Sequence, residues 1–188
     1  MRNRLIAAAV LSLALTACGG SSQGGTDAGT SYIAGDGSTI LLAKSQRGQP
    51  VSLAGTTLEG QPLVISDWVG SVVVINLWAS WCGPCRSEAA DLEQVNRQLA
   101  PQGVRFLGLN TRDGLAAAQA FQRRFPTGYP SIQDADGALT LVFGDLGPAA
   151  TPTTLILDRQ GRVAARILGP VEQAQLRDVV TAVLEEAQ

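Results

Sequence analysis

The stretch from Val72 to Trp78, Val-Val-Val-Ile-Asn-Leu-Trp, limits the fold more than any other part of the sequence. A nearly continuous apolar run of this kind is typical of a strand that is buried on both faces, inside a sheet that helices cover. Residues 84–100 follow it with apolar side chains at helical spacing, at Ala89, Leu92, Val95 and Leu99. Pro101 and Gly103 end that pattern. A buried strand that leads into an amphipathic helix predicts an α/β domain.

Further strand and helix signals follow along the chain. The patterns predict a strand at 104–110, a helix at 115–125 that ends before Pro126, a hairpin formed by 153–158 and 162–168, and a closing helix at 171–187. Short extended pieces at 51–53 and 62–65 indicate a hairpin or edge strands before the central strand. Parallel pairing first and antiparallel pairing last predict a mixed central β-sheet with helices on both faces and an N-terminal hairpin extension.

The N-terminus has the pattern of an export signal. Arg2 and Arg4 precede the apolar run Leu5 to Leu15, which suits a signal-peptide core of about 7–15 residues but not a membrane span of about 20. The next residues, Leu15-Thr16-Ala17-Cys18, resemble a bacterial lipobox, in which the cysteine is lipidated once residues 1–17 are removed. This resemblance implies a lipoprotein held at the cell membrane on its extracytoplasmic side. An ordinary secretory signal that ends beside a cysteine is the alternative.

A segment rich in glycine and serine follows Cys18. Residues 19–31 have no apolar periodicity and no side chains suited to a core. We expect a flexible tether over 18–46, which would hold the folded part on the order of 25–30 Å from the membrane. The remaining residues, 47–188, are expected to form one folded domain.

The composition excludes several kinds of chemistry. The chain has 188 residues, no histidine, and 14 basic against 16 acidic residues. The absence of histidine excludes Ser-His-Asp catalysis, zinc sites with histidine ligands and haem held by histidine. A net charge of −2 without a basic run gives no electrostatic basis for binding a phosphate backbone. We therefore expect no nucleic-acid partner.

The cysteines carry the chemistry of this chain. If Cys18 is lipidated, the mature protein keeps two others, Cys82 and Cys85, in Trp81-Cys82-Gly83-Pro84-Cys85. A Cys-x-x-Cys pair is either half of a zinc site or a redox dithiol. Zinc needs four ligands, and the chain has neither a second cysteine pair nor a histidine. We therefore expect a redox-active disulfide between Cys82 and Cys85, with no metal and no other cofactor.

The position of this pair favours a reactive thiolate. The pair lies between the buried strand and the first turn of the predicted helix, where free backbone N–H groups and the helix dipole favour negative charge. Such a site lowers a thiol pKa from about 8.5 toward 7. Cys82 is therefore the expected nucleophile, and Cys85 is the thiol that resolves the mixed disulfide. Pro84 presets the first helical turn, and Gly83 lets a partner chain approach closely.

These residues resemble the active-site signature of the thioredoxin superfamily. The resemblance is carried by Trp78-Ala79-Ser80-Trp81-Cys82-Gly83-Pro84-Cys85, and residues 85–88, 103–108 and 151–153 extend it to the TlpA/ResA-like branch of membrane-anchored thiol-disulfide oxidoreductases. It implies a thioredoxin-like fold for residues 47–188. It also implies that Pro152 forms a cis peptide bond that faces the dithiol and, with Thr151 before it, presents its backbone to the substrate cysteine. Cis bonds are accessible at X-Pro, and a trans-Pro at the start of a strand is the alternative.

The same resemblance assigns a proton acceptor. Asn76 stands where thioredoxin has a buried acid, and an amide cannot accept or release a proton. ResA-like proteins instead carry a glutamate three residues after the second cysteine, which is Glu88 here. A partly buried carboxylate at this place would take the proton of Cys85, and a solvated acid in the first helical turn is the alternative. Trp81 is expected to belong to the docking surface beside the dithiol, or else to be a half-buried core residue.

The resemblance also implies a function outside the cytoplasm. It implies a disulfide reductase that acts on cysteine-containing exported proteins, for example apocytochrome c during cytochrome c maturation. The Gly-Pro between the cysteines resembles reducing thioredoxins. Electrons would come from a membrane protein of the DsbD or CcdA kind, and we expect a monomer. A disulfide oxidant or isomerase, and a non-catalytic binding lipoprotein in which the dithiol is incidental, are the open alternatives.

Overall fold

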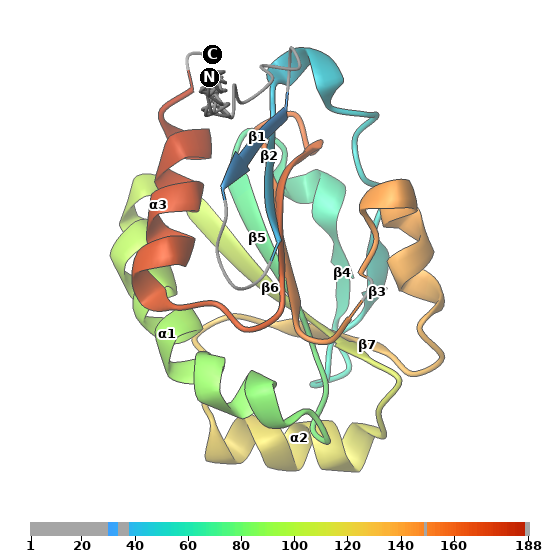
Figure 1. The fold of residues 1–188 in the computed structure, drawn as a ribbon. Helices are drawn as coiled ribbons and strands as arrows, with labels where there is room; N and C mark the ends of the chain where they lie inside the picture. The colour runs from blue at the N-terminus through green and yellow to red at the C-terminus, as the bar shows by residue number, and fades with distance from the viewer. Residues whose placement is uncertain (1–29, 34–37, 149, 187–188) are drawn as a thin grey trace, which may run out of the picture.

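The computed structural model of this chain describes residues 30–33, 38–148 and 150–186. A seven-stranded sheet has the order β1-β2-β9-β8-β5-β6-β7, and β3 and β4 form a separate hairpin (Figure 1). The strands are β1 (Thr30–Ile33), β2 (Thr39–Leu42), β3 (Ala54–Thr56), β4 (Pro62–Val64), β5 (Val72–Trp78), β6 (Val104–Thr111), β7 (Ser131–Asp134), β8 (Thr153–Leu157) and β9 (Val163–Leu168). The α-helices are α1 (Gly83–Leu99), α2 (Leu115–Arg124) and α3 (Gln173–Leu184), and the 3-10 helices are η1 (Lys44–Gln46), η2 (Ile65–Trp68), η3 (Ala100–Gln102) and η4 (Ala138–Leu146). None of the helices in these ranges has both the length and the apolar character needed to cross a bilayer.

The apolar run predicted to be the central strand is β5, and all of its side chains are buried. It pairs in parallel with β6 and antiparallel with β8, so the mixed sheet is confirmed. Successive side chains of a strand point to opposite faces. Asn76 and Trp78 therefore share the face on which Val74 packs against α1, whereas Ile75 and Leu77 point to the other face. This alternation places Asn76 under the helix that begins at the cysteines.

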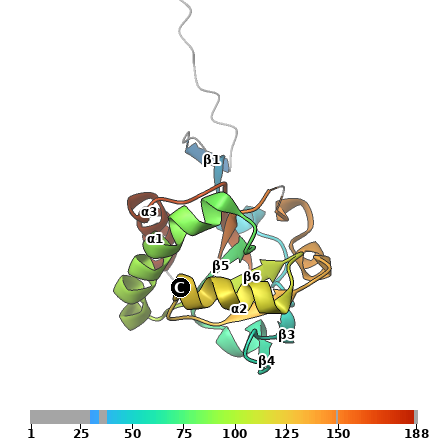
Figure 2. The same cartoon turned by 90° about the horizontal axis from the view of Figure 1, so that it is seen from below.

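The α-helices of the described ranges cover one face of the sheet. α1 and α3 lie side by side there (Figures 1 and 2), and Leu92 and Val95 of α1 share a core with Val180 of α3. α2 packs on the same face, since its Phe121 lies against Trp78 with ring centroids 4.7 Å apart. The strands β5, β6 and β7 follow one another in one direction across the sheet. Right-handed crossovers between them put α1 and α2 on the same side.

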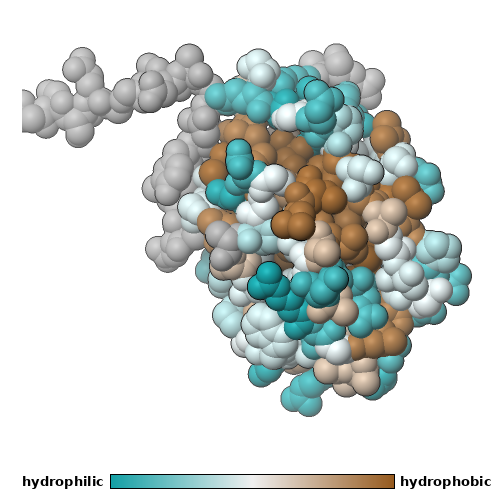
Figure 3. Space-filling model, turned by 90° about the vertical axis from the view of Figure 1, so that its right-hand side faces the viewer, coloured by the Kyte–Doolittle hydropathy of each residue, from teal (hydrophilic) through white to brown (hydrophobic). Residues whose placement is uncertain are grey.

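The opposite face is covered by the β3–β4 hairpin, η2 and η4. Side chains of these segments pack against the odd-numbered residues of β5. The packing side chains include Leu63, Trp68, Leu139 and Phe143. We expected helices on both faces; on this face the described helices are the short 3-10 segments η2 and η4. Hydrophobic residues also reach the surface on this side (Figure 3), where Leu141 and Val142 of η4 are exposed.

The structure differs from the flexible tether expected over 18–46. Residues 39–42 form β2, which extends the sheet beside β9, and η1 follows. Residues 30–33 form β1, which pairs with β2. The expectation is therefore wrong for 30–33 and 39–46, because strand pairing with β2 and β9 satisfies the backbone of these segments and Leu41 packs against the core. The signal peptide, Cys18 and residues 19–29 lie outside the described residues.

Two other parts of the chain are not predicted by its pattern. We predicted neither β7 nor η4 from the sequence. β7 contains one large apolar residue, Ile132, and is specified by its parallel pairing with β6. The N-terminal hairpin is present, but its first strand lies at 54–56 rather than 51–53. Val51 and Leu53 are buried in irregular backbone, where the N–H of Val51 donates to Gly161 O at 2.8 Å. Their apolar character reflects core packing rather than strand pairing.

Candidate active site

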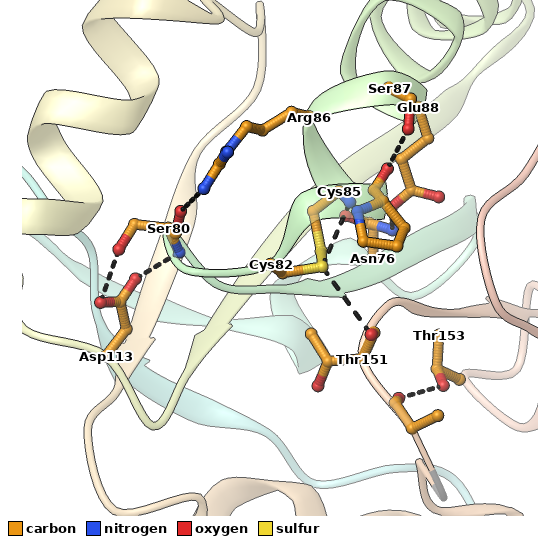
Figure 4. The surroundings of a disulfide bond; sticks show 12 residues. Asn76, Ser80, Cys82, Cys85, Arg86, Ser87, Glu88, Asp113, Thr151 and Thr153 are labelled. Atoms are coloured by element: carbon orange, nitrogen blue, oxygen red, sulfur yellow. Dashed lines mark hydrogen bonds between the residues drawn. A yellow bond between two sulfur atoms is a disulfide. The ribbon is translucent and has the colours of Figure 1, made fainter.

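The two cysteines form a disulfide at the first turn of α1 (Figure 4). Cys82 is the N-cap residue of this helix, and Pro84 occupies its first turn as expected. The backbone N–H of Cys85 donates to Cys82 Sγ at 3.1 Å. Each cysteine is 3% exposed, so exposure does not distinguish them. The hydrogen bond does, because a donated N–H at a helix N-terminus stabilises negative charge on the sulfur of Cys82.

The loop before β8 faces this sulfur. The Thr151–Pro152 peptide bond is cis, as expected, and the trans alternative is wrong. The carbonyl oxygen of Thr151 lies 3.7 Å from Cys82 Sγ, and a dashed line joins the two atoms in Figure 4. Thr153 Oγ1 donates to Ala150 O at 2.6 Å, and Gly169 N–H donates to Pro152 O at 3.0 Å. These bonds fix the shape of the loop and join it to the end of β9.

Three residues around the disulfide form its exposed rim. Trp81, Gly83 and Pro84 are exposed, and Trp81 is 58% exposed. The indole Nε1 of Trp81 donates to the carbonyl of Arg112 at 3.0 Å, which holds the ring against the β6–α2 loop. The alternative of a half-buried core tryptophan is therefore wrong. A Cβ added at Gly83 would meet no atom within 4 Å, so this position is open to a partner chain.

Glu88 lies on the inner side of the dithiol helix. It is 1% exposed, so the alternative of a solvated acid is wrong. Its Oε1 accepts from Asn76 Nδ2 and its Oε2 accepts from the N–H of Val171, both at 2.9 Å. Burial raises the pKa of the Glu88 carboxyl to about 7, against the opposing effect of these two hydrogen bonds. Because Glu88 is three residues after Cys85, both side chains lie on neighbouring positions of one helix face.

The amide of Asn76 forms a hydrogen bond with the Glu88 carboxylate, and not with the sulfur atoms. Asn76 Nδ2 donates both to Glu88 and to Thr154 Oγ1, the latter at 3.2 Å. The sequence showed that Asn76 cannot titrate, but it contained no signal that its amide, or the N–H of Val171, would bind Glu88. Those contacts join β5, β8 and the segment before α3, which only the fold brings together.

A second acid, Asp113, fixes the turn that precedes Cys82. Its carboxylate accepts from Ser80 N–H at 2.6 Å and Ser80 Oγ at 2.8 Å, from Asn110 Nδ2 at 3.0 Å and from Gly114 N–H at 2.9 Å. These hydrogen bonds hold the pKa of Asp113 below its ordinary value although partial burial opposes them. Sequence reasoning missed this brace, because Asp113 lies 33 residues after Ser80.

The site has the parts needed for thiol-disulfide exchange. A sulfur at a helix N-terminus, a second sulfur one turn further on and a buried carboxyl group with a pKa near neutrality lie together behind an open rim. The described residues contain no group of three or more His, Cys, Asp or Glu side chains placed to hold a metal ion.

Comparison with known proteins identifies relatives of this chain. Residues 43–183 match the family model described as Redoxin. The chain is 38% identical over 117 residues to the thiol:disulfide interchange protein DsbE of Pseudomonas aeruginosa, an alignment that covers 62% of this chain and 61% of that protein. It is 26% identical over 123 residues to the thiol-disulfide oxidoreductase ResA of Bacillus thuringiensis, covering 65% of this chain and 69% of that one.

Solved structures agree with this assignment. A secreted thiol-disulfide isomerase from Corynebacterium glutamicum superimposes with a TM-score of 0.74 and 33% identity, over 85% of this chain and 100% of that one. A DsbF homologue from Corynebacterium diphtheriae has a TM-score of 0.72 and 31% identity, over 82% of this chain and 99% of that one. These matches confirm the thioredoxin-like fold. The chain therefore belongs to the Redoxin family, as a thioredoxin-fold relative of its thiol-disulfide oxidoreductases.

Proposed function

We propose that this protein is an extracytoplasmic thiol-disulfide oxidoreductase that reduces disulfide bonds of exported proteins. The observation that carries the proposal is the placement of Cys82, whose sulfur accepts the N–H of Cys85 and faces the carbonyl of Thr151 beside a cis-proline. An exposed rim at Trp81 and Gly83 leaves room for a client chain.

The exchange balances in two steps. The thiolate of Cys82 attacks one sulfur of the client disulfide, and the other client sulfur leaves as a thiolate that takes up a proton. The thiolate of Cys85 then attacks the Cys82 sulfur, which breaks the mixed disulfide and releases the second client thiol. Two electrons pass to the client, and the protein is left with the Cys82–Cys85 disulfide found in the structure. A membrane electron donor of the DsbD or CcdA kind would return the two electrons.

Glu88 supports the second step as a proton acceptor. Cys85 must lose its proton before it attacks, and it is buried, which disfavours the thiolate. A carboxyl group with a pKa of about 7 is ionised in part at neutral pH and can take that proton. Asn76 and the N–H of Val171 hold the carboxylate in place while its charge changes.

The location and the clients belong to the same proposal. The Leu15-Thr16-Ala17-Cys18 sequence supports a lipid anchor on the extracytoplasmic side of the membrane. Cysteine-containing exported proteins, including apocytochrome c with its haem-binding cysteine pair, are the proposed clients, and the protein is proposed to act as a monomer.

The direction of electron flow is tested by the reduction potential of the Cys82/Cys85 pair. The potential is measured in the full chain carrying Cys18→Ser, equilibrated with glutathione or dithiothreitol buffers, together with the rate of insulin-disulfide reduction. We expect a potential below about −240 mV with turnover of insulin. A potential above about −150 mV would reject the reductase in favour of a disulfide donor or isomerase, which the relative named a thiol-disulfide isomerase makes the second candidate.

A binding protein without redox chemistry makes a different prediction. In that case Cys82→Ser leaves the function of the protein in cells intact, whereas the reductase loses it completely. Cys85→Ser is the matched variant, because it should accumulate a mixed disulfide with clients through Cys82. Failure of Cys85→Ser to trap any client, together with a functional Cys82→Ser chain, would overturn the proposal.

A further inference from the structure

A hollow of about 150 Å³ opens beside the disulfide. It is lined by Thr111, Arg112, Thr140, Pro148, Ala150 and Thr151. Thr151 links the hollow to the reaction, because its carbonyl oxygen lies 3.7 Å from Cys82 Sγ. Residues next to a client cysteine begin about 3.8 Å away along the client chain, so they reach the hollow when that cysteine is joined to Cys82. A space of about 150 Å³ accommodates a benzene ring, and therefore one side chain of moderate size.

Arg112 determines the charge of this hollow. It is the charged residue of the lining, and its guanidinium forms no ion pair or hydrogen bond with a residue of the described ranges. Two of the three threonine hydroxyls in the lining are already used, since Thr111 Oγ1 donates to Asp134 Oδ2 at 3.3 Å and Thr140 Oγ1 donates to Gly137 O at 2.7 Å. The side-chain donors left for a ligand are the hydroxyl of Thr151 and the N–H groups of Arg112, whose planar fork fits a carboxylate.

The backbone of Arg112 is held in a conformation that residues other than glycine rarely adopt. Its φ is 50°, and every other positive φ recorded in the described residues belongs to a glycine. Its N–H donates to Asp134 O at 2.9 Å, and its carbonyl accepts from Trp81 Nε1 at 3.0 Å. Non-glycine residues in this region persist where their surroundings hold them, and such residues concentrate at ligand-binding sites.

The side chain of Arg112 is positioned as well. It crosses Gly137, where an added Cβ would lie 2.7 Å from Arg112 Nε and would displace the arginine side chain. The acids nearby have other partners: Asp113 accepts from Ser80, Asp134 accepts from Leu139 N–H, and Asp136 accepts from Ala138 N–H. None of these three forms an ion pair with Arg112. The guanidinium therefore stays available at the wall of the hollow.

We propose that this hollow is a client subsite in which Arg112 binds the carboxylate of an aspartate or glutamate lying within two residues of the client's reactive cysteine. The inference rests on the proposed function and narrows its substrate class, from any exposed disulfide to one with an acidic neighbour. Because Arg112 and Trp81 share a hydrogen bond, the subsite is tied directly to the residue before Cys82.

The test measures mixed-disulfide equilibria in the full chain carrying Cys18→Ser and Cys85→Ser. Its Cys82 is first joined to glutathione in a mixed disulfide. Short peptides with a single cysteine then displace the glutathione. Each peptide carries Asp, Asn or Lys at one position, either one or two residues before or after its cysteine. Each exchange releases one glutathione for one peptide, so there is no net oxidation. For each chain, the equilibrium constant for exchange with the Asp peptide is divided by that for the Lys peptide. This ratio is then compared between the chain with Arg112 and the chain with Arg112→Gln. The comparison cancels the effect that each flanking residue has on the peptide's own thiol.

At one flanking position we expect the Asp-to-Lys ratio to be about fivefold larger with Arg112 than with Arg112→Gln, in keeping with a partly exposed ion pair. Arg112→Lys should keep most of this preference, and Arg112→Glu should reverse it. Arg124→Gln is the matched control, since it removes the same charge from the last turn of α2 and should leave the ratio unchanged. If Arg112→Gln does not fold, raising the salt to about 1 M with Arg112 present should abolish the preference.

Equal ratios with Arg112 and Arg112→Gln at every position would overturn the subsite and leave the reductase proposal standing. If the Asp-to-Lys ratio in the chain with Arg112 does not change with salt concentration, the subsite is overturned in the same way and the reductase proposal still stands. If no peptide forms a mixed disulfide with Cys82 in any chain, the proposed function fails, and the subsite fails with it.

Discussion

The carboxyl group of Glu88 lies three residues beyond Cys85 on α1, and its chemistry is set by its surroundings. Asn76 and the N–H of Val171 bind its two oxygens, and burial raises its pKa to about 7. A group with a pKa near the working pH exchanges protons most effectively. The sequence left a buried and a solvated carboxylate open at this position, and burial against β5 and the segment before α3 decides between them.

Glu88→Gln should slow disulfide exchange. Loss of a proton acceptor costs about 10²-fold or more in the step that it assists, so the release of client from the mixed disulfide should slow by that order at pH 7. The wild-type rate should rise through a pKa of about 7, and the variant should lose this dependence. Single-turnover kinetics between pH 5 and 9 measure both effects.

Asp91→Asn is the matched control for this prediction. The Asp91 carboxylate raises the pKa of Glu88, so its removal should shift the pH profile slightly to lower pH and keep its shape. A profile in Glu88→Gln that still follows the wild-type curve would assign the proton transfer to another group.

The raised pKa of Glu88 also affects stability, with a definite sign. The folded-state pKa of about 7 lies above the unfolded value of about 4.3, so the folded protein binds this proton more tightly. Ionisation of Glu88 therefore lowers the free energy of unfolding as the pH rises from about 4.5 to 7. The free energy of unfolding of Glu88→Gln, measured relative to that of wild type, should therefore be up to about 3 kcal/mol higher at pH 8 than at pH 5. Urea unfolding of the oxidised proteins tests this, and an equal difference at both pH values would contradict it.

Asp113→Asn should weaken the turn before the dithiol. The carboxylate accepts four hydrogen bonds, two of them from Ser80, and an amide cannot accept them all. We expect a loss of about 1–3 kcal/mol of unfolding free energy at pH 7. The lowered pKa of Asp113 means that its contribution is present above about pH 4 and is lost as the pH falls through the folded-state pKa. Asp136→Asn affects one exposed turn hydrogen bond and should lower the free energy of unfolding by less than Asp113→Asn does. Equal losses in the two variants, measured by urea unfolding, would refute the prediction.

At the scale of elements, Arg47 joins three segments that are distant in the sequence. Its guanidinium donates to Leu42 O at the end of β2, to Asp158 in the β8–β9 turn, and to Glu186 after α3. The side chain is 1% exposed and that of Asp158 is 4% exposed. These bonds fix the end of β2 to the domain, where the sequence pattern predicted a flexible segment.

Arg47→Met should release this junction. Breaking a buried ion pair by removing one partner costs about 3–5 kcal/mol, and we expect the lower end because Asp158 keeps Arg162 as a partner. Hydrogen exchange in β2 should rise together with the loss measured by urea unfolding. Arg162→Met, which removes the more exposed partner of Asp158, should cost less and leave β2 protected. Unchanged protection of β2 in Arg47→Met would show that edge pairing with β9 suffices.

At the scale of the whole molecule, the active site lies at one end of the central sheet, and residues 1–29 precede the described domain. Cys18→Ser should move the protein from the membrane fraction to the soluble extracytoplasmic fraction, because it removes the site of the proposed lipid. Insulin reduction by the Cys18→Ser chain should remain at the wild-type rate in solution. Membrane association that survives in Cys18→Ser would contradict the anchor, and fractionation with immunoblotting measures it.

The sequence by itself determined the central strand, the dithiol helix and the redox pair. These features depend on local patterns: continuous apolar residues, helical periodicity, and two cysteines at the start of a helix. It also determined that Asn76 could not titrate. Tertiary structure decided what depends on contacts between distant segments, such as the burial of Glu88, the brace from Asp113, the strand at 39–42 and the conformation of Arg112. Burial and pairing of this kind arise only when separate elements pack together, so no local pattern encodes them.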